Sequence, residues 1–203
     1  MRKKRKPKEL SLQQSIYIFC EGETEENYFR MLKQKYHRTE ISIARPKIEI
    51  KAMGRSGKML IHEAIAHTKG KDPGKIYVVF DRDDHGLQEI SECRKLAQKN
   101  NIEILFSSIC FEIWILMHFE PVFKSYSRPA LFQKLSGPQY FAQNYKDFKG
   151  ADVLHMRKFL YDRIKTAKEN ADALYLRKNN LLTDDPFTNI NCYLGEIFHT
   201  DQF

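Results

Sequence analysis

The sequence predicts an α/β protein with a mostly parallel, four-stranded sheet flanked by helices and followed by a helical C-terminal extension. Two apolar runs, residues 16–20 and 76–80, are rich in β-branched and aromatic side chains, as buried parallel strands are. Each run ends at a carboxylate, Glu21 and Asp81 respectively. From the first run to residue 106, strand patterns alternate with helix patterns, and this order favours a parallel sheet with right-handed crossovers.

The first strand leads into a helix through a tight turn. Gly22 follows Glu21, and Thr24 is a favourable N-cap residue for a helix from about Glu25 to Tyr36. In open α/β sheets, ligands bind beyond the carboxyl ends of the strands. This turn is therefore the first candidate for a functional site.

The next elements continue the alternation. Residues 47–52 alternate between apolar and charged side chains, which indicates a strand with one exposed face near the edge of the sheet. Ser56 is expected to cap a helix that runs to about Thr68. After the second acidic strand, residues 87–100 are predicted to form a helix and residues 102–106 a short strand.

Carboxylates gather at the ends of the two buried strands. Asp81 and Asp83 are separated by one residue, so an extended backbone would direct both side chains to the same side. If the two strands are neighbours, Glu21 joins this pair at one edge of the sheet. Crowded carboxylates repel one another, and a hard cation such as Mg²⁺ relieves that repulsion. The sequence therefore predicts a divalent-metal site at this edge.

The most apolar part of the chain, residues 107–119, contains a single acidic side chain, Glu112. A buried carboxylate requires a cation, a hydrogen-bond donor or water. We expect Glu112 in the first turn of a helix, directed towards the strand ends. The alternative is a glutamate at the exposed rim of a buried helix. His118 is interpreted as a core or helix-end residue rather than a catalyst.

The charge balance narrows the classes of function. The 203 residues include 34 Lys and Arg against 26 Asp and Glu, which gives a net charge of +8. A basic protein with a local acidic cluster suits a polyanionic substrate such as nucleic acid, although net charge alone does not establish such binding. The four cysteines lack metal-ligand spacing, which argues against a zinc site and a disulfide framework. Because no apolar stretch approaches ~18 residues, we expect a cytoplasmic protein without membrane contact.

The sequence divides into three regions. Residues 1–14 form a basic tail that is expected to be disordered. Residues 15–124 form the predicted catalytic core. Residues 125–203 are expected to form a helical extension packed on that core.

Within the extension, residues 153–171 are predicted to form one helix, with Leu154, Phe159, Leu160 and Ile164 facing inward. Residues 184–189 are predicted to form a turn, and the following residues a short helix to about His199. Basic and aromatic residues are interleaved around Lys146. This pattern suits side chains that stack on bases and contact phosphates. It equally suits an amphipathic helix packed on the core.

Several motifs in this order resemble the RloB family, whose members are linked to restriction and abortive-infection loci and are similar to Toprim-type nuclease domains. The motifs are Glu21-Gly22-x-Thr24-Glu25, Asp81-x-Asp83, Ser107-x-x-x-Phe111-Glu112-x-Trp114 and, more weakly, Tyr145-Lys146 with Asp185-Pro186-Phe187-Thr188-Asn189. The main resemblance extends from about Ser15 to Phe119. It implies a Toprim-like, Rossmann-like fold and divalent-metal phosphodiester chemistry.

The resemblance also implies roles for individual acidic residues. Glu21 is expected to act as a general acid or base or to help hold metal. Asp81 and Asp83 match the metal-binding pair, and Glu25 and Glu112 match further acidic positions of nuclease-type relatives. The metal would be Mg²⁺ (or Mn²⁺), held by Glu21, Asp81, Asp83 and Glu112, and stabilising the attacking water and the leaving oxygen.

The predicted nucleic-acid contacts are basic residues near this edge and in the extension: Arg55, Lys58, Arg82, His85 and Lys146. Lys58 and Arg82 are candidates to neutralise charge that develops on a phosphate. His85 is a candidate to assist proton transfer or to contact a phosphate. The loop that contains Arg55 lacks the spacing of a P-loop, and a plain turn is the alternative interpretation.

The leading hypothesis is a metal-dependent nuclease that acts on DNA or on RNA such as tRNA, as the effector of a prokaryotic anti-phage system. Such systems imply an ATPase partner protein. A second hypothesis is a non-catalytic module that holds a metal and binds nucleic acid or a partner. A third, an aspartyl-phosphate phosphohydrolase, is less favoured because Asp81 follows another acidic strand instead of coming first. The oligomeric state stays open.

Overall fold

The computed structural model describes residues 15–36, 48–52, 54, 56–71, 73–83 and 85–203. The strands are β1 (Ser15–Cys20), β2 (Ile48–Ala52), β3 (Pro73–Asp81), β4 (Ile102–Ser108) and β5 (Phe187–Thr188). The helices are α1 (Glu23–Tyr36), α2 (Gly57–Thr68), α3 (Leu87–Lys99), α4 (Glu112–Met117), α5 (Arg128–Leu135), α6 (Tyr145–Phe148), α7 (Val153–Leu160), the 3-10 helix η1 (Tyr161–Arg163), α8 (Ile164–Tyr175) and α9 (Ile190–Phe198). The predicted basic tail, residues 1–14, lies outside the described residues.

The described strands form one mixed sheet in the order β2-β1-β3-β4-β5. The first four strands are parallel, and β2 lies at one edge, as its alternating pattern predicted. The prediction of four strands was incomplete, because β5 pairs antiparallel with β4 through Ser107 and Ser108. Residues predicted as a turn thus cover part of the edge of β4, whose backbone groups would otherwise lack partners.

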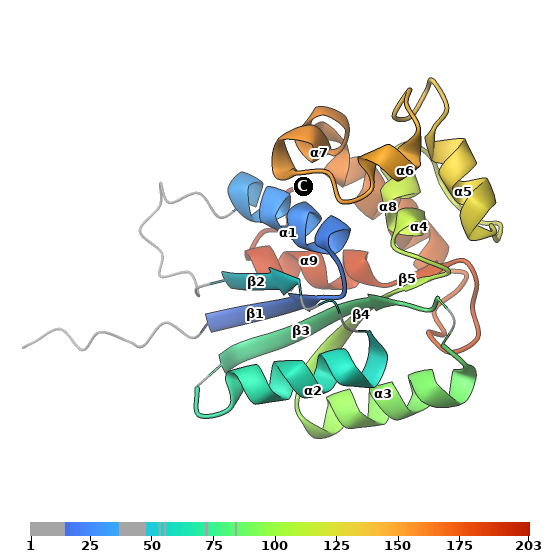
Figure 1. Ribbon diagram of the computed structural model, residues 1–203. Helices are drawn as coiled ribbons and strands as arrows, with labels where there is room; N and C mark the ends of the chain where they lie inside the picture. The colour runs from blue at the N-terminus through green and yellow to red at the C-terminus, as the bar shows by residue number, and fades with distance from the viewer. Residues whose placement is uncertain (1–14, 37–47, 53, 55, 72, 84) are drawn as a thin grey trace, which may run out of the picture.

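Helices cover both faces of the sheet (Figure 1). Helices α2 and α3 lie against one face, where they pack on side chains such as Phe19, Val78 and Phe106. Helices α1 and α9 and the remaining C-terminal helices lie on the other side (Figure 1). There, the buried cluster contains Ile18 and Val79 of the sheet together with side chains of α1 and of α4 to α9. β1 and β3 bury side chains on both faces, which explains their continuous apolar sequences.

The helix predicted over residues 153–171 is interrupted. The chain forms α7, the short 3-10 helix η1, and then α8. The side chain of Lys35 on α1 donates a hydrogen bond to the carbonyl of Tyr161 at this break, a tertiary contact that a local pattern does not encode. Leu154, expected to face inward, is 68% exposed, so that part of the prediction was wrong.

The strand order places a switch point beside β1, because β2 lies on one side of β1 and β3 on the other. In open α/β sheets, the crevice beyond the carboxyl ends of the strands at such a point is the usual ligand site. Glu21 follows β1 and Asp81 ends β3, so both residues stand at this crevice. Within the described residues, no helix combines the length and apolar character needed to cross a membrane.

Candidate functional site

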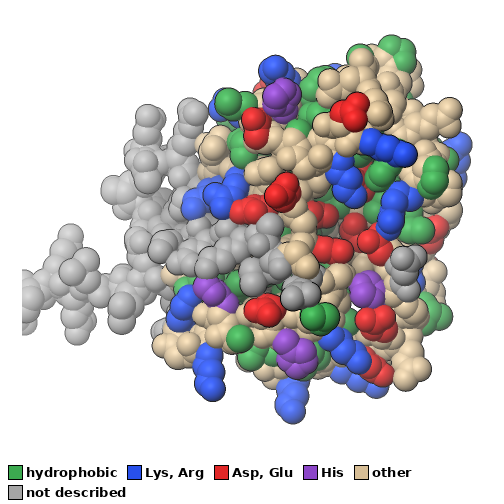
Figure 2. Space-filling view, viewed as in Figure 1, with side chains coloured by type: hydrophobic (Ala, Val, Ile, Leu, Met, Phe, Trp, Pro, Cys, Tyr) green, Lys and Arg blue, Asp and Glu red, His purple; other side chains and the backbone are tan. Residues whose placement is uncertain are grey.

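Four acidic side chains meet at the carboxyl end of the sheet, and we call Glu21, Glu25, Asp81 and Glu112 the acidic cluster. β1 and β3 are neighbours, and the backbone N–H of Glu21 donates to the carbonyl of Val79 at 2.9 Å. Glu25 lies in the first turn of α1, and Glu112 begins α4. Figure 2 shows acidic side chains across the middle of this face, with Lys and Arg side chains beside them.

Burial and mutual repulsion disfavour the ionised form of carboxyl groups in the cluster. Burial is the largest cause that raises the pKa of Glu25 to about 7, and the charges of Glu112 and Glu21 act in the same direction. A backbone hydrogen bond and the charge of Lys149 act in the opposite direction. Burial, followed by Glu25 and Glu112, raises the pKa of Asp81 well above its ordinary value. These carboxylates therefore keep protons at a pH where exposed carboxylates would lose them, unless a cation is present.

The most deeply buried oxygens of the cluster lack hydrogen-bond donors. Oδ1 of Asp81 and both carboxylate oxygens of Glu112 have no hydrogen-bond partner within the described part of the chain. Glu112 is only 1% exposed. Buried polar atoms normally have partners, so these acceptors mark a place where a cation or a ligand is expected.

Lys149, which was not among the predicted site residues, faces the cluster. The Nζ atom of Lys149 lies 3.5 Å from Oε1 of Glu112 and 5.4 Å from the centre of the Phe132 ring. Partial burial lowers the pKa of Lys149, but the charges of Glu112 and Glu25 outweigh that effect, and the net shift is upward. Lys149 therefore stays protonated beside the carboxylates.

Helix α6 directs Lys149 and Tyr145 to the cluster and leaves Lys146 exposed. The hydroxyl of Tyr145 is buried without a hydrogen-bond partner among the described residues. Burial, followed by the charge of Glu112, raises the pKa of that hydroxyl. Of the interleaved basic and aromatic residues, Lys149 contacts the acidic cluster, whereas a nucleic-acid contact by Lys146 stays a prediction.

Glu21 is held by a chain of polar side chains. The hydroxyl of Ser56 donates to Oε2 of Glu21 at 2.9 Å and lies 2.8 Å from Nε2 of His85. Nδ1 of His85 in turn lies 3.0 Å from Oε2 of Glu89. Ser56 occupies the N-cap position of α2 as predicted, but its side chain makes no capping hydrogen bond, because it contacts Glu21. A Cβ at Gly57 would come within 3.1 Å of Cε1 of His85, so glycine permits this close approach.

Asp83 does not join Asp81 in the way the sequence suggested. β3 ends at Asp81, and Asp83 has a φ of 39°, so the extended backbone assumed for this pair is absent. Asp83 forms an ion pair with Arg128 of α5, and the carboxylates that raise the pKa of Asp81 are Glu25, Glu112 and Glu21. The expected alternation was wrong here; whether Asp83 binds metal stays a prediction.

Two of the other basic residues predicted to contact nucleic acid, Arg82 and Lys58, have contacts within the protein. The guanidinium of Arg82 donates to Oγ of Ser108 at 2.8 Å and to the carbonyls of Leu181 and Leu182 at 3.0 and 2.9 Å. Burial lowers its pKa. Lys58 forms an ion pair with Glu92 on the surface. Arg55 lies outside the described residues.

The residues present fit a divalent cation in their chemistry. Buried carboxylate oxygens without partners and raised carboxyl pKa values are relieved when a hard cation binds. As the side chains are placed, no three described His, Cys, Asp or Glu residues stand in an arrangement that could hold a metal ion. Metal binding therefore requires carboxylate side chains to rotate, and it competes with the ion pair between Lys149 and Glu112.

The fold and the site define an open-sheet α/β protein with a carboxylate centre at the strand switch point. The chain belongs to the RloB-like protein family, whose model matches residues 16–197. No curated protein and no solved structure matches the chain.

Proposed function

We propose that this RloB-like protein is a Toprim-type, divalent-metal-dependent nuclease that hydrolyses phosphodiester bonds. The observation that carries the proposal is the set of buried carboxylate oxygens of Asp81 and Glu112 that have no hydrogen-bond donor within the described residues. They lie beyond β1 and β3 at the switch point of the sheet, where open α/β proteins bind ligands.

In this proposal, Glu21, Asp81 and Glu112 hold the metal. Mg²⁺ or Mn²⁺, when bound, polarises the phosphate and lowers the pKa of a bound water. The hydroxyl of Ser56, backed by His85, fixes the orientation of Glu21. Asp83, which the family resemblance places in the metal-binding pair, would have to leave Arg128 to take part.

Two further side chains act on the substrate. Lys149 lies next to Glu112 and, once displaced by metal, is placed to contact a phosphate oxygen and offset its developing charge. Glu25, whose pKa is raised to about 7 in the metal-free protein, would lose its proton when metal binds and would then be able to accept a proton from the attacking water. Both side chains already lie at the acidic cluster in the metal-free protein.

The net charge supports nucleic acid as the substrate class. A net charge of +8 favours a polyanion, and nucleic acid is the polyanion on which phosphodiester chemistry acts. We further propose that the protein is the effector of a prokaryotic anti-phage system and works with an ATPase partner. The resemblance of its motifs to proteins of restriction and abortive-infection loci supports that role.

A second candidate function is a non-catalytic module that binds nucleic acid or a partner protein. The ion pair of Lys149 with Glu112 favours it, because the cluster already has a cation of its own. In such a module, substitution of Glu21 leaves nucleic-acid affinity unchanged and no strand is cut.

The test is cleavage of total RNA and of plasmid DNA by the purified full chain in Mg²⁺ or Mn²⁺. Asp81→Asn removes a buried carboxylate, and Asp147→Asn is the matched control because Asp147 is exposed on α6. We expect cleavage by the wild type and the control, and no cleavage by Asp81→Asn or in EDTA. Nucleic-acid binding without cleavage would support the second candidate, and cleavage that persists in Asp81→Asn would contradict the proposed site.

A further inference from the structure

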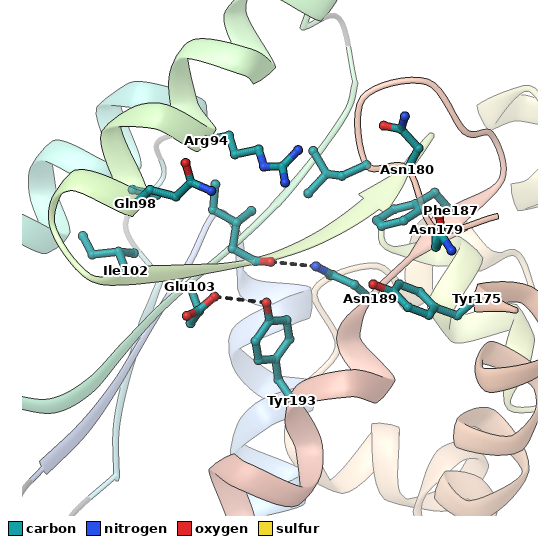
Figure 3. A pocket seen from close by; sticks show the side chains of 13 residues that line it. Arg94, Gln98, Ile102, Glu103, Tyr175, Asn179, Asn180, Phe187, Asn189 and Tyr193 are labelled. Carbon is teal, nitrogen blue, oxygen red and sulfur yellow. Dashed lines mark hydrogen bonds between the residues drawn. The ribbon is translucent and has the colours of Figure 1, made fainter.

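A cavity of about 480 Å³ lies apart from the acidic cluster, between α3, the edge of β4 and the segment that follows α8 (Figure 3). None of the four clustered carboxylates lines it. Its volume falls within the range of small-molecule sites, roughly 300–1,000 Å³. The cavity is therefore large enough for a ligand of its own.

The cavity exists because β5 covers only the end of β4. β5 pairs with Ser107 and Ser108 of β4. The side chain of Asn189 forms the next hydrogen bonds to the backbone of β4. Its Oδ1 accepts from the N–H of Phe106 at 2.7 Å, and its Nδ2 donates to the carbonyl of Ile104 at 2.9 Å. Beyond Asn189, no strand of the described residues pairs with this edge of β4, and the space between α3 and the C-terminal segment stays open.

Side chains with free hydrogen-bonding groups line this space. Arg94 and Gln98 extend from α3, and Asn179 lies on the opposite segment (Figure 3). The side chains of these three residues make no ion pair or hydrogen bond with the part of the chain that the structure describes. An arginine without an acidic partner is suited to bind a phosphate in a bidentate manner. Primary amides are suited to the donor and acceptor edges of a base.

Aromatic rings and one carboxylate complete the lining. The half-buried ring of Tyr175 packs against Phe187, with 6.2 Å between the ring centres. A base is able to stack on such a ring. On the floor of the cavity, Oε2 of Glu103 accepts a hydrogen bond from the hydroxyl of Tyr193 at 3.1 Å, which leaves its second oxygen for another donor. Acidic side chains in this role accept hydrogen bonds from ribose hydroxyls.

We propose that this cavity binds a nucleoside monophosphate. Arg94 binds the phosphate, Glu103 the ribose, and Gln98 and Asn179 the edge of the base, with Tyr175 beneath it. The same chemistry is offered by a free mononucleotide and by the terminal nucleotide of a bound strand. The site is separate from the proposed nuclease centre and does not depend on that activity.

Calorimetric titration of AMP, GMP, CMP and UMP into the full chain tests the site. We expect at least one of them to bind, and Arg94→Ala to weaken that binding about tenfold to a hundredfold, since hydrogen bonds between charged groups are lost. Lys95→Ala is the matched control, because Lys95 is the exposed neighbour of Arg94 on α3 and does not line the cavity. It should leave the affinity unchanged. The corresponding nucleoside, which lacks the phosphate, should bind as weakly to the wild type as the nucleotide binds to Arg94→Ala.

A second titration with a short oligoribonucleotide that carries a 5′ phosphate separates the two sources. Tighter binding of the oligonucleotide, lost in Arg94→Ala, assigns the cavity to a strand end, whereas tighter binding of the mononucleotide assigns it to a free ligand. Failure of all four mononucleotides and of the oligonucleotide to bind at millimolar concentration would overturn the proposal. Equal loss of affinity in Lys95→Ala and Arg94→Ala would also overturn it, because the effect would then be general electrostatics. Neither result bears on cleavage, which Asp81→Asn tests independently.

Discussion

Nζ of Lys149 lies 3.5 Å from Oε1 of Glu112, so a lysine from the C-terminal helices supplies the positive charge beside the most deeply buried carboxylate of the acidic cluster. The core and the C-terminal region therefore build one site between them. In the metal-free protein, this contact offsets part of the negative charge of the cluster. In the proposed metal-bound state, the same lysine would be free to contact the substrate.

Lys149→Met should reduce cleavage about a hundredfold, the usual consequence of removing one preorganised electrostatic group. It should also lower metal-free stability by about 1 kcal/mol, a small figure because the side chain is 48% exposed and solvent screens its charge. Lys146→Met is the matched control, since Lys146 lies in α6 one turn before Lys149 and makes no ion pair with the described residues. Cleavage rates and thermal unfolding of both variants check this, and equal losses in both would argue against a specific role for Lys149.

The raised pKa of Glu25 predicts that metal-free stability falls as pH rises. The folded-state pKa of about 7 exceeds the ordinary 4.5, so the folded protein binds a proton that the unfolded chain has already released. Its stabilisation is complete below pH 4.5 and is lost as the pH rises through about 7. At about 1.4 kcal/mol per pKa unit, the loss is up to about 3 kcal/mol.

Thermal unfolding in EDTA between pH 4.5 and pH 8 measures this dependence, because the range includes the ordinary pKa of 4.5 and the folded-state pKa of about 7. Glu25→Gln should flatten the fall in Tm, because the glutamine side chain does not titrate. Buried His118, whose pKa is lowered to about 4, acts in the opposite direction at acidic pH, but its effect cancels in the difference between wild type and variant. A pH dependence identical in the two proteins would show that Glu25 has an ordinary pKa.

Arg82→Ala should destabilise the fold whether or not nucleic acid is present. The substitution removes the donor to Ser108, Leu181 and Leu182, and hydrogen bonds to a charged group contribute about 1.5–3 kcal/mol. For a chain of this size, that corresponds to a fall in Tm of roughly 3–12 °C. Lys58→Ala, which breaks a surface ion pair, is the comparison and should change Tm by a degree or two at most. A stable Arg82→Ala variant with weakened nucleic-acid binding would restore the phosphate role that the sequence suggested.

The parts of the site that belong to strands were predictable from sequence. Continuous apolar runs specify buried parallel strands, and the carboxylates at their ends identified Glu21 and Asp81. The condition for bringing them together, that the two strands are neighbours, is met because β1 pairs with β3. Glu112 was recognisable because a single acid within a long apolar run must meet a partner.

The contacts that sequence reasoning missed depend on tertiary structure. Lys149 lies far along the chain from Glu112, and only the packing of α6 brings them together. The expectation for Asp83 assumed an extended backbone, which the positive φ at that residue removes. Ser56 was predicted to cap α2, but its hydroxyl donates a hydrogen bond to the nearby Glu21 instead.

Calorimetric titration of Mn²⁺ or Mg²⁺ into the full chain tests the central claim, that the buried carboxylates form a metal site. We expect saturable binding to the wild type, accompanied by proton release because Glu25 and Asp81 retain protons in the metal-free protein. The proton release is seen as a dependence of the heat on the buffer. We expect no binding to Asp81→Asn and normal binding to Asp147→Asn. Absence of binding to the wild type, or undiminished binding to Asp81→Asn, would contradict it.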